Sequence, residues 1–215
     1  MALIPARPRV RTAKPGQVEG VIRGKATSGS TAPEIKNFDL QVNATSVVTG
    51  TPYIQSLTSG IAEGAAIAQR IGAKILVKSI DIEMNITTSP GGSIGLSTGC
   101  FLDVFVVWDK QPDGATPTAG SVLVAATTNL SFGNVNNLER FVVLRRKSFV
   151  FDETQGMNAI YRDHVPFQLA TRFGDATAAP QTNDIYVMAV SPNAVAAGAT
   201  TANIAYVSRC KFTDA

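Results

Sequence analysis

Apolar and polar residues alternate in several segments of this chain, which is the pattern of β-strands with one buried and one wet face. In 36–45 every second residue is apolar, and the same alternation recurs in 79–86. Just upstream, Ile75 and Val77 fall on the opposite parity, so we expect a β-bulge near Lys78 or burial on both faces. Both segments therefore predict strands.

Six other segments also predict strands. The run 101–108 is almost continuously apolar, as in a central strand, and 141–151 is a long strand interrupted by basic residues. Pro166 indicates that its strand begins at an edge or a bulge, because proline cannot donate to the ladder. The remaining strands are expected at 53–57, 165–171, 185–190 and 204–210.

The sum is about eight strands joined by long loops. The segment 61–71 has helical leanings that Gly64 weakens, and no strong helical repeat is present to make crossovers between parallel strands. We therefore predict an all-β fold, a single eight-stranded jelly-roll sandwich over residues 34–215.

The composition bears on how much of the protein's own surface is covered by neighbouring molecules. Of its 215 residues, 45% are hydrophobic and 16% charged, against roughly 25% charged for an average soluble domain. This balance fits a protein whose flanks are covered by neighbours, or simply a Ser-, Thr- and Ala-rich β protein. No apolar run approaches the roughly 18 residues of a membrane helix, and no secretory signal is evident, so we expect synthesis inside the cell and no membrane insertion.

Positive charge is concentrated at the N-terminus. Residues 1–33 hold six basic residues and one acidic residue, whereas 34–215 hold thirteen basic and fifteen acidic residues. The first segment is rich in Pro, Gly, Ser and Thr and has no strand or helix period, so we predict a flexible basic arm. Such an arm suits a polyanion, and its candidate nucleic-acid-binding residues are Arg7, Arg9, Arg11, Lys14, Arg23 and Lys25.

A second basic cluster interrupts the 141–151 strand. Alternation puts Arg145 and Lys147 on one face and Arg146 on the other. One face is a candidate for contact with nucleic acid or with a carboxylate of a neighbouring subunit, and a solvated edge is equally consistent with the pattern.

Candidate catalytic and metal-ligating residues are few. The single histidine, His164, lies on the polar parity of its strand, where a surface or interface role is expected. Asp81 and Glu83 share one strand face and could offer oxygens to calcium between subunits, although a solvated polar face is the favoured explanation. Cys100 and Cys210 are expected to be buried free thiols. We predict no enzymatic activity and no cofactor.

Four segments stand in order along the chain: Glu34-x-Lys36-x-Phe38-Asp39, Arg70-Ile-Gly72 followed by Lys78-Ser-Ile-Asp-Ile82, Val106-Val-Trp-Asp-Lys-Gln-Pro-Asp-Gly-Ala115 and Asn137-Leu-Glu-Arg-Phe-Val-Val-Leu144. Together they resemble segments of the capsid proteins of small circular single-stranded DNA viruses of eukaryotes. Related jelly rolls occur in small RNA plant viruses and satellite viruses. The resemblance covers about residues 34–150, and the C-terminal third is supported by its strand pattern alone.

The resemblance implies a capsid protein of the virion, made inside the host cell or its nucleus if the genome is DNA. It implies self-assembly into an icosahedral shell of about 60 copies or a small multiple. It also implies packaging of a single-stranded genome, DNA before RNA, through the arm. The arm departs from the family in being less densely basic.

Two other classes of protein are compatible with the predicted fold. A non-viral ligand- or carbohydrate-binding module would need exposed aromatic residues gathered in one cleft. A cupin-type metalloenzyme would need several histidine ligands, and this chain has one.

Overall fold

The structure is a computed structural model. It describes residues 33–48, 50–89, 100–125, 131–151, 158–174, 178–192 and 201–215. The predicted flexible arm, residues 1–33, lies outside the described residues except for Pro33, so it stays a prediction.

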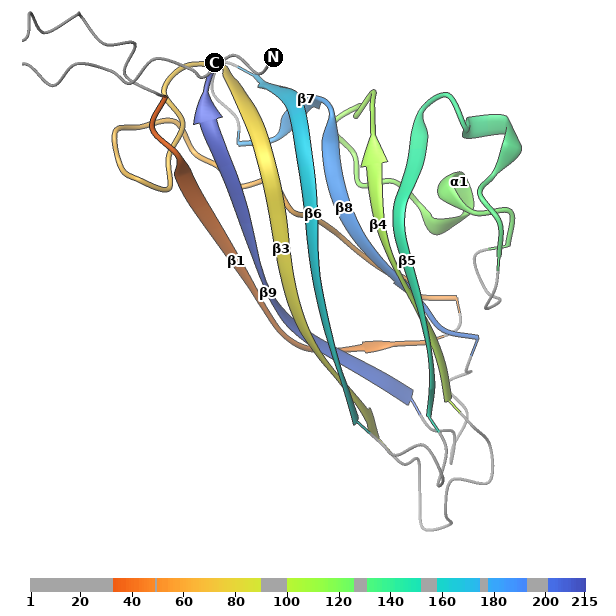
Figure 1. Ribbon diagram of the computed structural model, residues 1–215. Helices are drawn as coiled ribbons and strands as arrows, with labels where there is room; N and C mark the ends of the chain where they lie inside the picture. The colour runs from red at the N-terminus through yellow and green to blue at the C-terminus, as the bar shows by residue number, and fades with distance from the viewer. Residues whose placement is uncertain are drawn as a thin grey trace, which may run out of the picture. The chain divides into compact units, whose positions relative to one another are not determined.

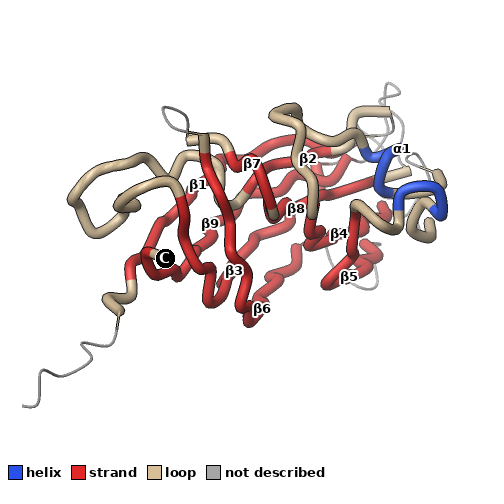
Figure 2. The backbone as a smooth tube through the Cα atoms, turned by 90° about the horizontal axis from the view of Figure 1, so that it is seen from above, coloured by secondary structure: helices blue, strands red, loops and turns tan. Residues whose placement is uncertain are grey.

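Within these described ranges, nine strands form two antiparallel sheets, whose arrangement Figures 1 and 2 show. In one, the order is β1-β9-β3-β6-β7, and in the other it is β2-β8-β4-β5. The strands are β1 (Lys36–Val47), β2 (Tyr53–Ser56), β3 (Lys74–Ser89), β4 (Cys100–Asp109), β5 (Phe141–Phe151), β6 (Asn158–Phe173), β7 (Pro180–Thr182), β8 (Asp184–Val190) and β9 (Thr201–Asp214).

The connections confirm the predicted jelly roll. The chain passes back and forth between the two sheets, so that β1, β3, β6 and β9 lie in one sheet and β2, β4, β5 and β8 in the other. Strand β7, which was not predicted, belongs to the first sheet; it is three residues long and falls in 174–183, where a loop was expected. The fold class is therefore right, and the described residues contain nine strands where about eight were expected.

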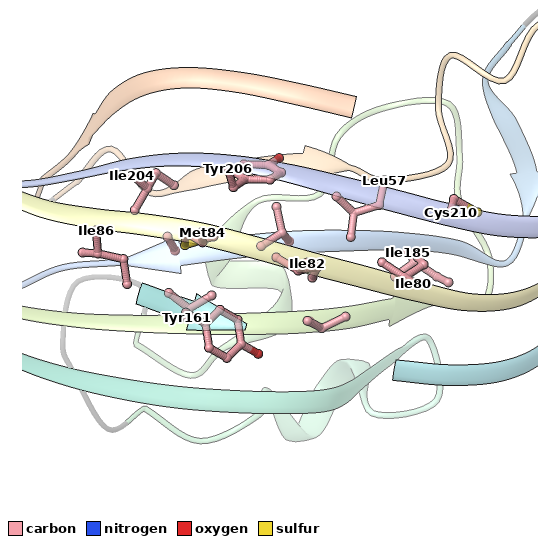
Figure 3. Packing of buried hydrophobic residues seen from close by; sticks show 14 of the residues in the cluster. Leu57, Ile80, Ile82, Met84, Ile86, Tyr161, Ile185, Ile204, Tyr206 and Cys210 are labelled. Atoms are coloured by element: carbon pink, nitrogen blue, oxygen red, sulfur yellow. The ribbon is translucent and has the colours of Figure 1, made fainter. Parts of the chain in front are cut away.

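The core lies between the sheets, where the alternating residues of β3 and β9 point inward (Figure 3). Ile80, Met84 and Ile86 of β3 are fully buried and meet apolar residues such as Ile204 and Ile185. A second apolar cluster covers the outer face of the four-stranded sheet beneath the short helix α1 (Ala119–Val122). Strand β4 is thus buried on both faces, which explains its continuous apolar run.

The expected bulge in β3 is present. The pairing of β3 with both β9 and β6 shifts between Val77 and Ser79, so Lys78 absorbs the change of parity. Because of this bulge, Ile75 and Val77 stay in the core together with the residues that follow. Pro166 pairs with Ser79 beside the same shift, so the bulge expected at Pro166 is present, whereas its strand begins at Asn158, earlier than the predicted start at 165.

The segment 61–71 is a closed loop and not a helix. The backbone of Arg70 bonds to Ala62 and Gly64 across the loop, which uses groups that a helix would need. A Cβ at Gly64 would meet the side-chain amide of Gln69, which would have to move aside. In the described residues, helical structure is limited to α1 and a 3-10 turn, η1 (Val135–Asn137), and neither was predicted.

Candidate nucleic-acid and subunit contact surfaces

The basic cluster lies in β5, the edge strand of the four-stranded sheet. Arg146 points to the outer face, where its Nη2 lies 2.6 Å from Oδ2 of Asp103 and its Nη1 donates to the carbonyl of Ser131. Its guanidinium also stacks over Phe105 at 5.2 Å. Because Asp103 is almost fully buried, Arg146 compensates a carboxylate within its own chain.

Arg145 and Lys147 point to the opposite face, as alternation predicts. Nε of Arg145 lies 3.6 Å from Oδ2 of Asp163 on β6, which also accepts a hydrogen bond of 2.8 Å from Tyr161. Burial, followed by that hydrogen bond, raises the pKa of Tyr161 well above its usual value, so the phenol keeps its proton. Lys147 is exposed, and no ion pair to it occurs among the described residues.

Lys147 lines a groove of about 370 Å³ between β5 and β6. The groove also contains the rings of Phe149 and Tyr161, which meet edge to face, and the side chains of Ile160 and Arg162. Arg162 is itself paired with Glu83. The cluster therefore offers less uncompensated positive charge than three consecutive basic residues imply, and Lys147 is its most available cation.

The six basic residues predicted in the arm lie outside the described residues. Their role in binding nucleic acid stays a prediction.

A row of ion pairs crosses the outer face of the five-stranded sheet. Asp39 on β1 forms two contacts of 2.7 Å with Arg209 on β9. Asp81 on β3 lies 2.8 Å from Nζ of Lys211 and 2.5 Å from Nδ1 of His164. The hydrogen bonds from Arg209 lower the pKa of Asp39, and hydrogen bonds from Lys211 and His164 outweigh burial to lower the pKa of Asp81.

These pairs account for the polar residues considered as metal ligands. Asp81 and Glu83 do share one face, but cationic side chains meet both carboxylates. No group of three or more His, Cys, Asp or Glu side chains suited to a metal occurs in the described part of the chain. His164 is an exposed surface residue of the polar face, with 59% of its side chain accessible.

One buried carboxylate has hydroxyl partners. Asp184 on β8 accepts hydrogen bonds from the side chains of Ser56 and Thr58 and from the backbone of Ile185. Burial raises the pKa of Asp184. These contacts fasten the end of β2 to β8, which is a structural role.

The motif residues behind the sequence resemblance hold loops in place. Arg140 binds Asp109 and Asp113 at the end of β4, which links two of the four segments. Lys36 is buried, and its Nζ lies 2.8 Å from Asp214 and 3.0 Å from the carbonyl of Gln69.

The guanidinium of Arg70 is also buried. It stacks over Phe173 at 4.8 Å and donates to the carbonyl of Gly72. Gly72 has a φ of 79°, which favours glycine at this turn.

Two clusters of exposed apolar side chains were not predicted. The first surrounds a hollow of about 370 Å³ beside α1 and β5, which we call the apolar hollow; its lining consists of Val122, Gly133, Leu138, Phe141, Val142 and Val143. Phe132, Val124 and Val135 stand exposed in the segments around it. The second cluster, the isoleucine knob, consists of Ile35, Ile67 and Ile71. The sequence signal that could have indicated both clusters is the presence of apolar residues outside the alternating segments.

No helix in the described residues is long and apolar enough to cross a membrane.

Comparison with known proteins gives matches to solved structures alone. No protein-family model matches the chain, and no curated protein matches it in sequence. Among solved structures, a chain of Desmodium yellow mottle tymovirus is 11% identical, with 95% of this chain and 94% of that chain covered and a TM-score of 0.26. A chain of the heated full particle of Israeli acute paralysis virus is 11% identical, with coverages of 98% and 80% and a TM-score of 0.25. These neighbours come from viruses, and at such TM-scores the matches carry no argument about the function of this chain.

Proposed function

We propose that this chain is a structural capsid protein that self-assembles into a closed icosahedral shell around a single-stranded nucleic-acid genome. The observation that carries the proposal is the exposure of large apolar side chains in clusters on a body whose core is already complete. Exposed apolar patches of this kind mark surfaces that other molecules cover. A jelly roll with the four capsid-like segments supplies the class of partner, namely further copies of the same chain.

The genome contact is assigned to the basic N-terminal segment. Six basic residues against one acidic residue in residues 1–33 favour salt-sensitive binding to phosphates without sequence preference. Lys147, exposed in its groove between β5 and β6, is a secondary contact, since an exposed cation can meet a phosphate. Single-stranded DNA is the expected genome because the sequence resemblance is to DNA viruses, and the protein then resides in the virion.

A ligand- or carbohydrate-binding module is the alternative. Such a module would gather exposed aromatic side chains in one cleft. Among the described residues the exposed aromatic side chains are Phe101, at the start of β4, and Phe132, in the segment before η1. They do not line a common pocket in this part of the chain, so the capsid proposal is preferred.

The test is expression of the full chain, followed by light scattering, electron microscopy and nuclease treatment of the purified protein. The expected result is uniform spherical particles that protect nucleic acid from the nuclease. Monomers across a wide range of salt and pH would overturn the proposal.

A further inference from the structure

We infer that the isoleucine knob of one copy inserts into the apolar hollow of a neighbouring copy, forming a heterologous contact between two different surfaces of the same chain. This inference rests on the proposed function, because it identifies one of the contacts that a shell would need. It is drawn from the shape, exposure and placement of the two apolar clusters.

The hollow is built to receive an apolar side chain. Its wall comes from β5 and from the segments on either side of η1, and Gly133 leaves Leu138 close to the backbone. The side chain of Leu138 remains 52% exposed and Val143 37% exposed, although both line the cavity. The chain's own residues therefore leave apolar wall in contact with water, which costs free energy in proportion to its area.

The rim of the hollow extends the same surface. Phe132 is 81% exposed and Val135 is 73% exposed. The backbone N–H of Val124 donates to the carbonyl of Phe132, so Val124 and Phe132 lie side by side. An exposed phenylalanine beside an apolar cavity, with few charged residues, is typical of an interface core.

The knob is formed by exposed apolar side chains near a loop that hydrogen bonds tie to the body. Ile67 and Ile71 project from the closed 61–71 loop with exposures of 65% and 62%, and Ile35 precedes β1 with 59%. Buried Lys36 ties the start of β1 to the carbonyl of Gln69 in that loop, and Asp214 accepts from the backbone of Ile71. These bonds tie the loop that carries Ile67 and Ile71 to the start of β1, next to Ile35, which limits the entropy lost on binding.

The two clusters cannot meet within one copy. The knob lies beside β1, an edge strand of the five-stranded sheet, whereas the hollow lies beside α1 and β5, at an edge of the other sheet. Both views of the body place these elements on opposite sides (Figures 1 and 2). A protrusion and a cavity on opposite sides of one molecule match a head-to-tail contact, which generates rings when the rotation closes. A second copy is therefore the occupant that the placement favours.

The test uses two single variants of the full chain, each defective in one surface. Ile67→Asp puts a charge on the knob, and Leu138→Asp puts a charge in the hollow. The matched control is Val207→Asp, which charges an exposed apolar side chain (47%) on β9, outside both clusters and outside the Lys147 groove. Sedimentation velocity is measured for each variant alone and for the equimolar mixture of the two.

We expect each variant to need at least about tenfold more protein than the wild type to assemble, which corresponds to roughly 1.4 kcal/mol per contact. The mixture is expected to form a larger species, absent from either variant alone, that holds the two chains in equal numbers. This species arises because Leu138→Asp copies keep an intact knob for the intact hollow of Ile67→Asp copies. The Val207→Asp protein is expected to assemble at the wild-type concentration.

Two results would overturn the inference. Assembly of Ile67→Asp or Leu138→Asp at the wild-type concentration would show that the contact is not used, while leaving the capsid proposal intact. A mixture containing nothing beyond the species of the separate variants would show that something other than a second copy covers the hollow. A monomeric wild-type protein would instead count against the capsid proposal itself.

Discussion

Arg140 binds both carboxylate oxygens of Asp109, with Nε 3.0 Å from Oδ1 and Nη2 2.9 Å from Oδ2. Asp109 is fully buried at the end of β4, and Arg140 stands one residue before β5. The same guanidinium reaches Asp113 and stacks over Phe141 at 4.8 Å. A single arginine thus links the two ends of the long connection between β4 and β5.

Removal of this arginine is expected to destabilise the fold. Arg140→Ala leaves the carboxylate of Asp109 buried without its counter-charge, and the loss of one partner of a buried pair costs about 3 kcal/mol. We expect the free energy of unfolding to fall by about this amount, measured by urea denaturation. Arg209→Ala is the control, because its pair with Asp39 is about half exposed and its loss should be near the limit of measurement. Equal losses for the two variants would contradict this reading.

The two cysteines provide a test of burial. Cys100 and Cys210 are free and buried in strands of opposite sheets, as the sequence predicted. Burial raises the pKa of Cys100 to about 11 and that of Cys210 to about 12, so little thiolate is present at neutral pH.

We expect both thiols to resist a thiol reagent in the native protein and both to react in denaturant without a reductant. Val150→Cys, at a position that is 39% exposed, should add one thiol that reacts in the native state. A disulfide between Cys100 and Cys210 would instead give no reactive thiol in denaturant.

The sequence predicted the parts of the fold that follow from local periodicity. Alternation located β3 and β9, and the parity change at Lys78 located the bulge, because side-chain direction in a strand has a period of two. It did not locate β7, because three residues are too few to show a period. The weak helical leanings of 61–71 do not produce a helix, because the backbone bonds of Arg70 close a loop that no local pattern records.

The candidate surfaces were predicted less well, for a physical reason. Three consecutive basic residues indicate positive charge, but the charge that remains depends on carboxylates distant in sequence. Asp103 lies on β4 and Asp163 on β6, and the fold brings them to Arg146 and Arg145 respectively. The apolar hollow was missed because its wall combines residues from several segments, none of which alternates.

The ion pairs on the five-stranded sheet predict a dependence of stability on pH. The folded pKa of Asp39 and of Asp81 lies below the unfolded value of about 3.9. Each carboxylate therefore stabilises the fold above that unfolded pKa, and the stabilisation is lost as the pH falls through the folded pKa. Because both side chains are more than a third exposed, solvent screens them, and we expect on the order of 0.5 kcal/mol from each.

The measurement is the melting temperature of the wild type, Asp39→Asn and Asp81→Asn between about pH 2 and pH 6. The wild type should melt higher than each variant near pH 6, and the gap should close toward pH 2. Glu139→Gln is the control, because no ion pair to Glu139 occurs among the described residues. A gap that persists at pH 2 would mean that packing, and not charge, causes the difference.

The salt dependence of nucleic-acid binding is expected to distinguish the contribution of the N-terminal segment from that of β5. Each phosphate contact that is lost reduces the slope of log affinity against log salt by about 0.7 for a single strand. Replacing Arg7, Arg9, Arg11 and Lys14 together by Gln should therefore reduce the slope by about 3, measured with a labelled single-stranded oligonucleotide, whereas Lys147→Gln should reduce it by about 0.7 at most. Arg146→Gln should mainly lower the melting temperature, since it leaves buried Asp103 without its cation. If Lys147→Gln reduced the slope more than the fourfold variant, the groove of β5, and not the N-terminal segment, would be the principal genome contact.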